Sequence, residues 1–292
     1  MNIVIVGKGK WGSAMGSLLK KNGQSFKFWK KGDALPSNSV IIMCIPTQAI
    51  RSILIESGKG LKHVIYINGA KGVERGTHKL PFQVASEILD GNIDYFSLIG
   101  PGFAEEVEKE MPTLVNIGFT KEKNSAAVRE LFQTDYFRVR LTKGIRALEL
   151  ASAFKNVYAI ACGLADGLGF ETNTRVKLII LAIEEFYSLS RKLKYSIDTR
   201  ALPGTIGDLI LTCNSEESRN FSFGKLLAKY KTAQAIKKIG ETVEGFTTVE
   251  SIPYFEESSK VKLPLARFVY EIIKADNPSK AKTLFQEFVK HA

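Results

Sequence analysis

One lysine stands inside a long run of apolar and small residues. Lys155 follows ELASAF and precedes a stretch rich in alanine and glycine. Burying an ammonium group costs free energy unless the group is paired or has a chemical role. In a water-poor site, a lysine can donate a proton to an oxyanion that develops during a reaction. Lys155 is therefore a candidate acid–base group.

A second set of polar residues follows in GDLILTCNSEESRN. Asp208 comes just after two glycines, and Thr212 stands one helical turn beyond it, so both side chains can share a helix face. Arg219 and Asn220 follow in a polar segment, and an arginine fork suits a phosphate group. With Lys155, these residues could bind a phosphorylated carbonyl compound. A structural role stays open for each residue alone, because Asp often begins a helix.

The N-terminus carries a glycine motif. Gly7, Gly9 and Gly12 in GKGKWG have the G-x-G-x-x-G spacing, after the Ile- and Val-rich residues 2–6 and before a predicted helix, Trp11 to Asn22. The first glycine of this motif makes a tight turn. The second lets the backbone approach a pyrophosphate, and the third allows close helix–strand packing. The free N–H groups of the helix start favour an anion. The motif predicts a dinucleotide-binding site.

The segment after the second predicted strand bears on the choice of dinucleotide. A carboxylate about 20 residues beyond the glycines normally holds the ribose 2′-OH of NAD. In FKFWKKGD, Lys30 and Lys31 occupy the expected place and Asp33 comes slightly later. Either Asp33 serves this role, or the lysines receive the 2′-phosphate of NADP. A lysine pair solvated in a turn is the third possibility, so NAD and NADP both stay open.

The elements that must position these residues alternate in the first half of the chain. Segments rich in β-branched and aromatic residues predict seven strands, at 2–6, 25–29, 40–46, 63–69, 95–100, 114–119 and 136–141. Helical patterns lie between several of them. Strands that are buried on both faces and alternate with helices predict an α/β domain with a largely parallel sheet.

The pattern changes near Lys143. From about Ile145 onward, the segments to Phe288 have helical periodicity and almost no strand signal. We expect a Rossmann-type dinucleotide-binding domain over residues 1–143 and an all-α substrate and catalytic domain over residues 144–292.

The composition is that of a globular protein. The 292 residues are 45% hydrophobic and 24% charged, with a net charge of +11. Lys and Arg are scattered, so a solvated surface or a small anionic substrate explains the charge better than nucleic acid does. Cys44, Cys162 and Cys213 lie far apart, which argues against a disulfide framework.

The sequence has no His/Cys spacing typical of a metal site, no targeting segment and no segment suited to a membrane span. We expect a cytoplasmic protein that binds no metal and does not insert into a membrane.

Over nearly its whole length, the sequence resembles the bacterial NAD(P)-dependent glycerol-3-phosphate dehydrogenase family. The matching blocks follow the family order: GKGKWGSAMG (7–16), IPTQ (45–48), GAKGVE (69–74), GPGFAEEV (100–107), PTLVNIG (112–118), ELASAFKNVYAIACGLADGLGFETNTR (149–175), GDLILTCNSEESRNFSFG (207–224) and VEGF (243–246). The resemblance implies hydride transfer between NAD(P)H and dihydroxyacetone phosphate, which yields sn-glycerol 3-phosphate for glycerophospholipid synthesis. A homodimer is the usual family state.

The resemblance also implies catalytic roles. Lys155 matches the lysine taken to protonate the alkoxide that develops at C2 of the substrate. Lys71 matches a second active-site lysine, while Asp208 and Thr212 match residues that orient the catalytic lysine and the substrate hydroxyls. We expect Lys71 and Arg219 to lower the pKa of Lys155, because like charges disfavour the ammonium form.

Other positions match binding residues. Arg219 and Asn220 match the phosphate-binding pair, and Asn156 lies in the substrate-binding block. The implied cofactor contacts are Gly7, Gly9, Lys10, Trp11, Gly12, Lys30, Lys31, Pro46, Lys71, Ala104, Arg219 and Glu244.

One segment departs from the family pattern. Between the second predicted strand and VIIMCIP, a helix and a further strand are missing, which shortens the first domain on the adenosine side.

Two other functions stay open. A related two-domain 3-hydroxyacid dehydrogenase would lack the phosphate-binding block with Arg219. A dinucleotide-sensing protein would bind the cofactor without turnover.

Overall fold

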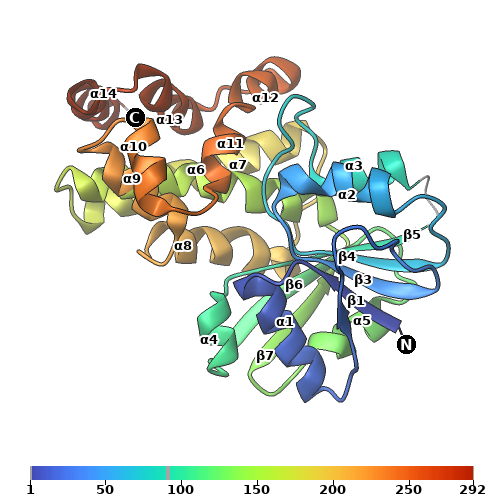
Figure 1. Ribbon diagram of the computed structural model, residues 1–292. Coiled ribbons are helices and arrows are strands. Elements are labelled where there is room, and N and C mark those ends of the chain that lie inside the picture. Colours follow the sequence, from blue (N-terminus) through green and yellow to red (C-terminus); the bar gives the residue numbers. More distant parts are fainter. Residues whose placement is uncertain (1, 90–92, 292) are drawn as a thin grey trace.

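An α/β domain and a helical domain lie side by side in the structure, a computed structural model that describes residues 2–89 and 93–291 (Figure 1). These residues form one seven-stranded sheet of order β2-β1-β3-β4-β5-β6-β7. The strands are β1 (Asn2–Val6), β2 (Lys27–Phe28), β3 (Ser39–Met43), β4 (Val64–Asn68), β5 (Ile93–Ile99), β6 (Thr113–Phe119) and β7 (Phe137–Thr142). The predicted fold class is confirmed, and the seven predicted strands are present with slightly shifted bounds.

Helices cover both faces of the sheet, which explains the apolar character of its strands. One face packs against α1 (Lys10–Lys21), α4 (Ala104–Glu108) and α5 (Ser125–Phe132) (Figure 1). The other face packs against α2 (Ile50–Ser57) and α3 (Pro81–Ile88). Parallel strands covered in this way carry apolar side chains on both sides, and every residue of β3 is buried.

The sheet is parallel except between β5 and β6, which pair antiparallel. The short strand β2 forms one edge and pairs with β1. Strands β2 and β3 flank β1 on opposite sides. Residues 29–38, which connect β2 to β3, all lie in the described part of the chain and contain no helix or strand. The helix and the further strand that the sequence predicted to be missing here are thus absent from residues 29–38.

The second half of the chain is helical. Its elements are α6 (Ile145–Gly167), α7 (Thr172–Lys192), η2 (Thr199–Ala201), η3 (Pro203–Gly207), α8 (Asp208–Cys213), α9 (Arg219–Leu227), α10 (Thr232–Ile239), α11 (Glu244–Val249), α12 (Ile252–Ser259), α13 (Pro264–Ala275) and α14 (Pro278–His291). Helix α6 is buried along most of its length and contacts α7, α8, α9, α11 and α13. It is the central helix of this domain, and the other helices pack around it.

Small residues let α9 lie directly against α6. A Cβ added to Gly163 of α6 would lie 1.9 Å from the Phe221 carbonyl oxygen, and one added to Gly224 of α9 would lie 2.1 Å from the Ile160 carbonyl oxygen. Both distances are far below van der Waals contact, so larger residues would force the helices apart. This close packing fixes the start of α9 relative to the middle of α6.

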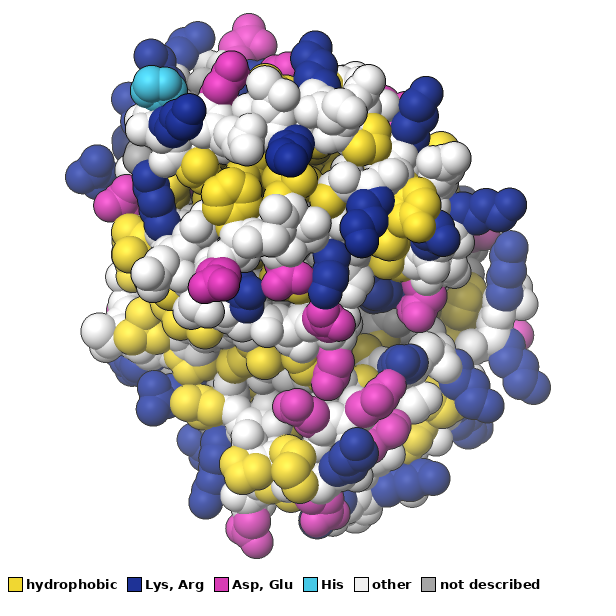
Figure 2. Space-filling model, turned by 90° about the vertical axis from the view of Figure 1, so that its left-hand side faces the viewer, with side chains coloured by type: hydrophobic (Ala, Val, Ile, Leu, Met, Phe, Trp, Pro, Cys, Tyr) yellow, Lys and Arg dark blue, Asp and Glu magenta, His cyan; other side chains and the backbone are white. Residues whose placement is uncertain are grey.

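Charged side chains of both signs share the surface. On the face shown in Figure 2, Lys and Arg are spread widely, with Asp, Glu and apolar side chains between them. The positive net charge is therefore not gathered into one stripe on this face. Within the described residues, no helix has the length and apolar character needed to cross a bilayer.

Candidate active site

Two lysines from different domains meet on one buried carboxylate. Asp208, the first residue of α8, is 1% exposed. Its Oδ1 accepts a hydrogen bond from Lys155 Nζ at 2.8 Å, and its Oδ2 accepts one from Lys71 Nζ at 2.9 Å. Thr212 Oγ1 also accepts from Lys155 Nζ at 2.7 Å and donates to the Asp208 carbonyl at 2.6 Å. The structure thus brings together four of the predicted residues.

The fold explains why these residues meet. Lys71 follows β4 at the carboxyl ends of the parallel strands, where ligands bind in open α/β sheets. Its Nζ is also 3.4 Å from the Gly100 carbonyl, just beyond β5. Lys155 comes from the middle of α6, and Asp208 from the start of α8. The cluster therefore joins the edge of the sheet to the central helix of the second domain.

Burial is the main influence on the acid–base properties of Lys155. It lowers the pKa of Lys155 to about 8, against the opposing effect of Asp208, and the charge of Lys71 lowers it further. The predicted effect of Lys71 is thus confirmed, but burial outweighs it. Burial alone would raise the pKa of Asp208, yet Lys155 and Lys71 hold this pKa below its ordinary value. A lysine titrating near pH 8 can both hold and release a proton at neutral pH.

The predicted phosphate-binding residues lie at the start of α9. Arg219 is half-exposed, and its Nη1 donates to Glu241 Oε2 at 3.1 Å. Asn220 is buried, and its Oδ1 accepts from the Gly245 N–H at 2.8 Å. A Cβ added to Gly245 would lie 2.5 Å from the Asn156 carbonyl oxygen. Asn156, Asn220 and Gly245 are therefore in contact, and Arg219 stands beside them with its guanidinium reaching solvent.

Arg219 also lies near the glycine turn of the first domain. A hydrogen bond with Glu105 raises the pKa of exposed Lys10, the first residue of α1, and Glu241 and Arg219 make smaller contributions of opposite sign. The charge of Arg219 therefore acts on the start of α1. This position suits a residue that contacts both a substrate phosphate and a cofactor pyrophosphate.

The glycine turn has the geometry that the motif predicts. Gly7 has φ +106°, and a Cβ there would lie 2.3 Å from the Cys44 carbonyl oxygen. A Cβ on Gly12 would lie 2.0 Å from the Gly7 carbonyl oxygen, whereas one on Gly9 would meet nothing within 4 Å. The turn is thus packed on its inner side and open at Gly9. A pyrophosphate fits at this open side, beside the N-terminus of α1.

A cluster of buried polar atoms surrounds Gly72, in the loop after β4. A Cβ on Gly72, which has φ +130°, would lie 2.9 Å from Glu244 Oε2, 3.4 Å from Thr47 Oγ1 and 3.6 Å from Thr248 Oγ1. In the described part of the chain, none of these three atoms has a hydrogen-bond partner. Burial raises the pKa of Glu244 to about 7, against the lowering effects of Arg219 and the Thr47 N–H. Unpaired buried polar atoms are costly, so this cluster fits a polar ligand group such as the amide of nicotinamide.

Glu244 is among the cofactor contacts that the sequence predicts, whereas Thr47 and Thr248 are not. Thr47 follows Pro46 in the matching block IPTQ, so that block carried a signal. The indole Nε1 of predicted contact Trp11 is also buried without a partner among the residues described, and it lies 3.1 Å from a Cβ added to Gly69. These atoms extend the candidate cofactor site along the edge of the sheet.

The remaining predicted cofactor contacts follow carboxyl ends of strands. Pro46 lies after β3, and Ala104 begins α4 after β5. Lys30, Lys31 and Asp33 are all exposed in the connection after β2. The structure therefore leaves both a carboxylate and two ammonium groups exposed in this connection.

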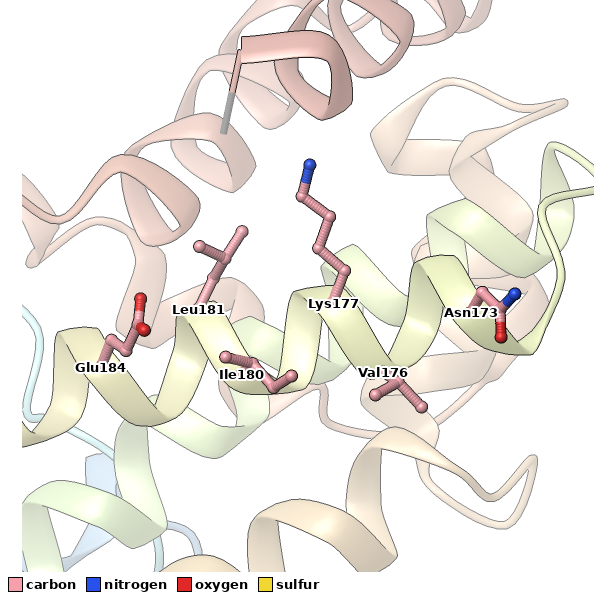
Figure 3. A pocket seen from close by; sticks show the side chains of 6 residues that line it. All are labelled: Asn173, Val176, Lys177, Ile180, Leu181 and Glu184. Carbon is pink, nitrogen blue, oxygen red and sulfur yellow. The ribbon is translucent and has the colours of Figure 1, made fainter.

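A separate pocket of about 410 Å³ lies on α7 (Figure 3). It is lined by Asn173, Val176, Lys177, Ile180, Leu181 and Glu184. Lys177 extends from one side of the helix, where its Nζ donates to the Val289 carbonyl at 2.9 Å, while Val176 and Ile180 point the other way. None of the candidate site residues lines this pocket.

Across residues 2–89 and 93–291, no cluster of three His, Cys, Asp or Glu side chains could hold a metal ion.

Comparison with known proteins decides the family. Residues 31–127 match the family described as NAD-dependent glycerol-3-phosphate dehydrogenase N-terminus, and residues 144–283 match the one described as NAD-dependent glycerol-3-phosphate dehydrogenase C-terminus. The chain belongs to the NAD-dependent glycerol-3-phosphate dehydrogenase family. The resemblance inferred from the sequence blocks is thereby confirmed.

Members of this dehydrogenase family match nearly the whole chain. A glycerol-3-phosphate dehydrogenase (NAD(P)+) from Maridesulfovibrio salexigens is 31% identical over 311 residues, which cover 94% of this chain and 94% of the relative. The enzyme of the same name from Bacillus cereus (strain G9842) is 30% identical over 308 residues, covering 93% and 91%. The crystal structure of glycerol-3-phosphate dehydrogenase (gpsA) from Coxiella burnetii has a TM-score of 0.89 at 24% identity and covers 99% of both chains. The fold is therefore shared from end to end.

Proposed function

We propose that this protein is an oxidoreductase that interconverts dihydroxyacetone phosphate and sn-glycerol 3-phosphate with NAD(P)H. The single observation that carries the proposal is the meeting of Lys155 and Lys71 on Asp208 at the carboxyl edge of the sheet. It is supported by membership of the dehydrogenase family and by relatives named glycerol-3-phosphate dehydrogenase (NAD(P)+). The product would serve glycerophospholipid synthesis.

NAD(P)H, when bound, would supply a hydride to the C2 carbonyl carbon of the substrate. The oxygen at C2 then gains negative charge, and Lys155 donates its proton to that oxygen. Asp208 and Thr212 hold Lys155 Nζ at 2.8 and 2.7 Å, so the proton donor is oriented before the substrate arrives. Lys71 places a second positive charge at the same carboxylate and stabilises the developing oxyanion.

Recognition of the substrate phosphate is assigned to the start of α9. The half-exposed guanidinium of Arg219 offers a charged fork, and its pair with Glu241 is a surface contact that a phosphate can replace. Asn220 and Asn156 line the adjoining buried face. On the cofactor side, Gly9 would admit the pyrophosphate, and Glu244 would contact the nicotinamide end.

The division of labour between the domains belongs to the same proposal. Residues 1–143 would bind the dinucleotide, and residues 144–292 would supply the substrate site and Lys155.

We also propose a cytoplasmic location and a homodimer. Three apolar side chains of α7, those of Val176, Ile180 and Tyr187, are 48%, 50% and 42% exposed, which supports burial against a second copy. Sedimentation of wild type and Ile180→Lys tests this, and a wild-type monomer would refute it.

Absorbance of NADH and NADPH, followed separately with dihydroxyacetone phosphate, tests the function. We expect oxidation of at least one cofactor and much slower turnover of phosphate-free dihydroxyacetone. Lys155→Met should abolish turnover and keep cofactor affinity, which fluorescence quenching measures. Faster turnover of the phosphate-free compound would point to a different dehydrogenase. A wild-type protein that binds both cofactors and oxidises neither would be a sensor.

A further inference from the structure

A second carboxylate is buried where the two domains meet. Glu149 of α6 has no exposed surface, and the hydrogen-bond donors to its carboxylate all come from the sheet domain. Its Oε1 accepts from Tyr95 Oη at 2.7 Å, from Asn68 Nδ2 at 3.4 Å and from the Ser97 hydroxyl. Its Oε2 accepts from the Phe82 N–H at 2.8 Å. The carboxylate thus ties the helix that carries Lys155 to strands β4 and β5 and to the start of α3.

Hydrogen bonds offset part of the effect of burial on this carboxyl group, whose pKa stays raised. Burial raises the pKa of Glu149, and its bonds with Ser97, Phe82 and Tyr95 act in the opposite direction. A carboxylate only accepts, so it satisfies four donors at once without a conflict. A group satisfied in this way is rigid, because moving it would leave several buried donors unpaired.

One of the four donors leads directly to Lys71. Asn68 is fully buried at the end of β4, and its Oδ1 accepts from the Ala70 N–H at 3.0 Å. Its Nδ2 donates to the Ala70 carbonyl at 3.0 Å as well as to Glu149. Both backbone groups of Ala70 are therefore held by one side chain. Lys71 is the next residue, so this contact sets the direction in which its side chain leaves the backbone.

We propose that Glu149 and Asn68 are positioning residues that hold Lys71 on Asp208. Glu149 fixes the amide of Asn68, Asn68 fixes Ala70, and the loop then delivers Lys71 Nζ to Asp208 Oδ2 at 2.9 Å. Because Glu149 lies on the same helix as Lys155, one carboxylate sets the distance between the two lysines. The importance of this distance for catalysis rests on the proposed function.

A double-mutant cycle separates positioning from general stability. Glu149→Gln should lower kcat between about 10- and 100-fold in the wild-type background, because Lys71 is displaced from the reacting group. In the Lys71→Ala background, the same substitution should change kcat less than about twofold, because the residue through which it acts is gone. Equal losses in the two backgrounds, or no loss in the wild-type background, would overturn the proposal.

The chain offers a matched control. Glu185 is also a buried carboxylate, and it accepts from the N–H groups of Leu265 and Ala266 at the start of α13. Glu185→Gln should leave kcat unchanged, although it replaces a buried carboxyl group in the same way. If Glu149→Gln does not fold, Asn68→Ser tests the same cycle, since it leaves the other three donors of Glu149 in place. The same loss and the same dependence on Lys71 are expected.

A crystal structure of Asn68→Ser or Glu149→Gln tests the positioning without any substrate. We expect the Lys71 Nζ–Asp208 Oδ2 distance to increase from 2.9 Å to beyond hydrogen-bonding range. An unchanged distance would refute the positioning role even in an active enzyme. An increased distance in the variant, together with a wild-type protein that fails to reduce dihydroxyacetone phosphate, would instead refute the proposed function alone.

Discussion

The two neighbours of Lys155 should shift its titration in opposite directions. The pKa of Lys155 is lowered from 10.5 to about 8, which corresponds to a cost of about 3 kcal/mol for its charged form. Asp208 opposes this lowering and Lys71 adds to it. Because Lys155 must be protonated to reduce a ketone, kcat for reduction should fall as pH rises through about 8.

Asp208→Asn removes the negative charge 2.8 Å from Lys155 Nζ. An opposite charge at such a distance changes a pKa by about 1–3 units, so the alkaline limb of kcat should move down by that amount. Lys71→Ala should move the limb to higher pH, because a like charge is lost. Initial rates at saturating dihydroxyacetone phosphate and cofactor, measured from pH 5 to 10, give kcat as a function of pH for both variants.

Asp276→Asn provides the control for this experiment. Asp276 follows α13 at the surface, where its Oδ1 accepts from the Thr232 N–H, and its loss should leave the profile unchanged. A limb that stays in place in Asp208→Asn, or moves upward, would refute the assignment of the titrating group to Lys155.

Three further outcomes follow from the geometry. Arg219→Ala should raise KM for dihydroxyacetone phosphate about 10- to 100-fold with a smaller change in kcat, since a charged hydrogen bond contributes about 1.5–3 kcal/mol. Steady-state kinetics measure both constants, and an unchanged KM would mean that the substrate phosphate binds elsewhere. Gly9→Ala should keep the melting temperature and weaken NADH binding, whereas Gly12→Ala should lower the melting temperature because its Cβ would lie 2.0 Å from the Gly7 carbonyl oxygen. Calorimetry measures both melting temperatures, and equal values for the two variants would contradict the packing of the turn. Burial raises the pKa of Glu185 from 4.5 to about 7, so the folded state binds this proton more tightly than the unfolded state does. The free energy of unfolding should therefore fall by about 3 kcal/mol as pH rises from 4.5 to 7. Urea titrations should show a smaller fall for Glu185→Gln than for the wild type, and an equal fall would assign it to other groups.

Much of the fold follows from the sequence because burial leaves a clear pattern. Strands such as β3 are apolar throughout, since helices cover both faces of the sheet. The glycine spacing located the turn before α1 for a similar reason, because a Cβ at Gly7 or Gly12 would clash with the backbone. The antiparallel pairing of β5 with β6 was not predicted, since an apolar strand carries no mark of its direction.

The site was predicted less evenly. Lys155 was found because an ammonium group is costly in an apolar helix, and the same argument applied to Glu149 six residues earlier would have found the second buried charge. Thr248 was missed because only its unpaired burial marks it, and Thr47 was missed although it lies in the matching block IPTQ. The pairing of Arg219 with Glu241 depends on how α9 and the loop before α11 fold together. Residues 22 positions apart give no local signal of such a contact.

A crystal structure with NADH or NADPH and dihydroxyacetone phosphate bound tests the central claim most directly. Lys155 Nζ should lie about 3 Å from the C2 oxygen of the substrate, on the side where the nicotinamide ring packs. Its contacts with Asp208 and Thr212 should persist. An ammonium group turned away from the substrate, with another acid at the C2 oxygen, would contradict the account.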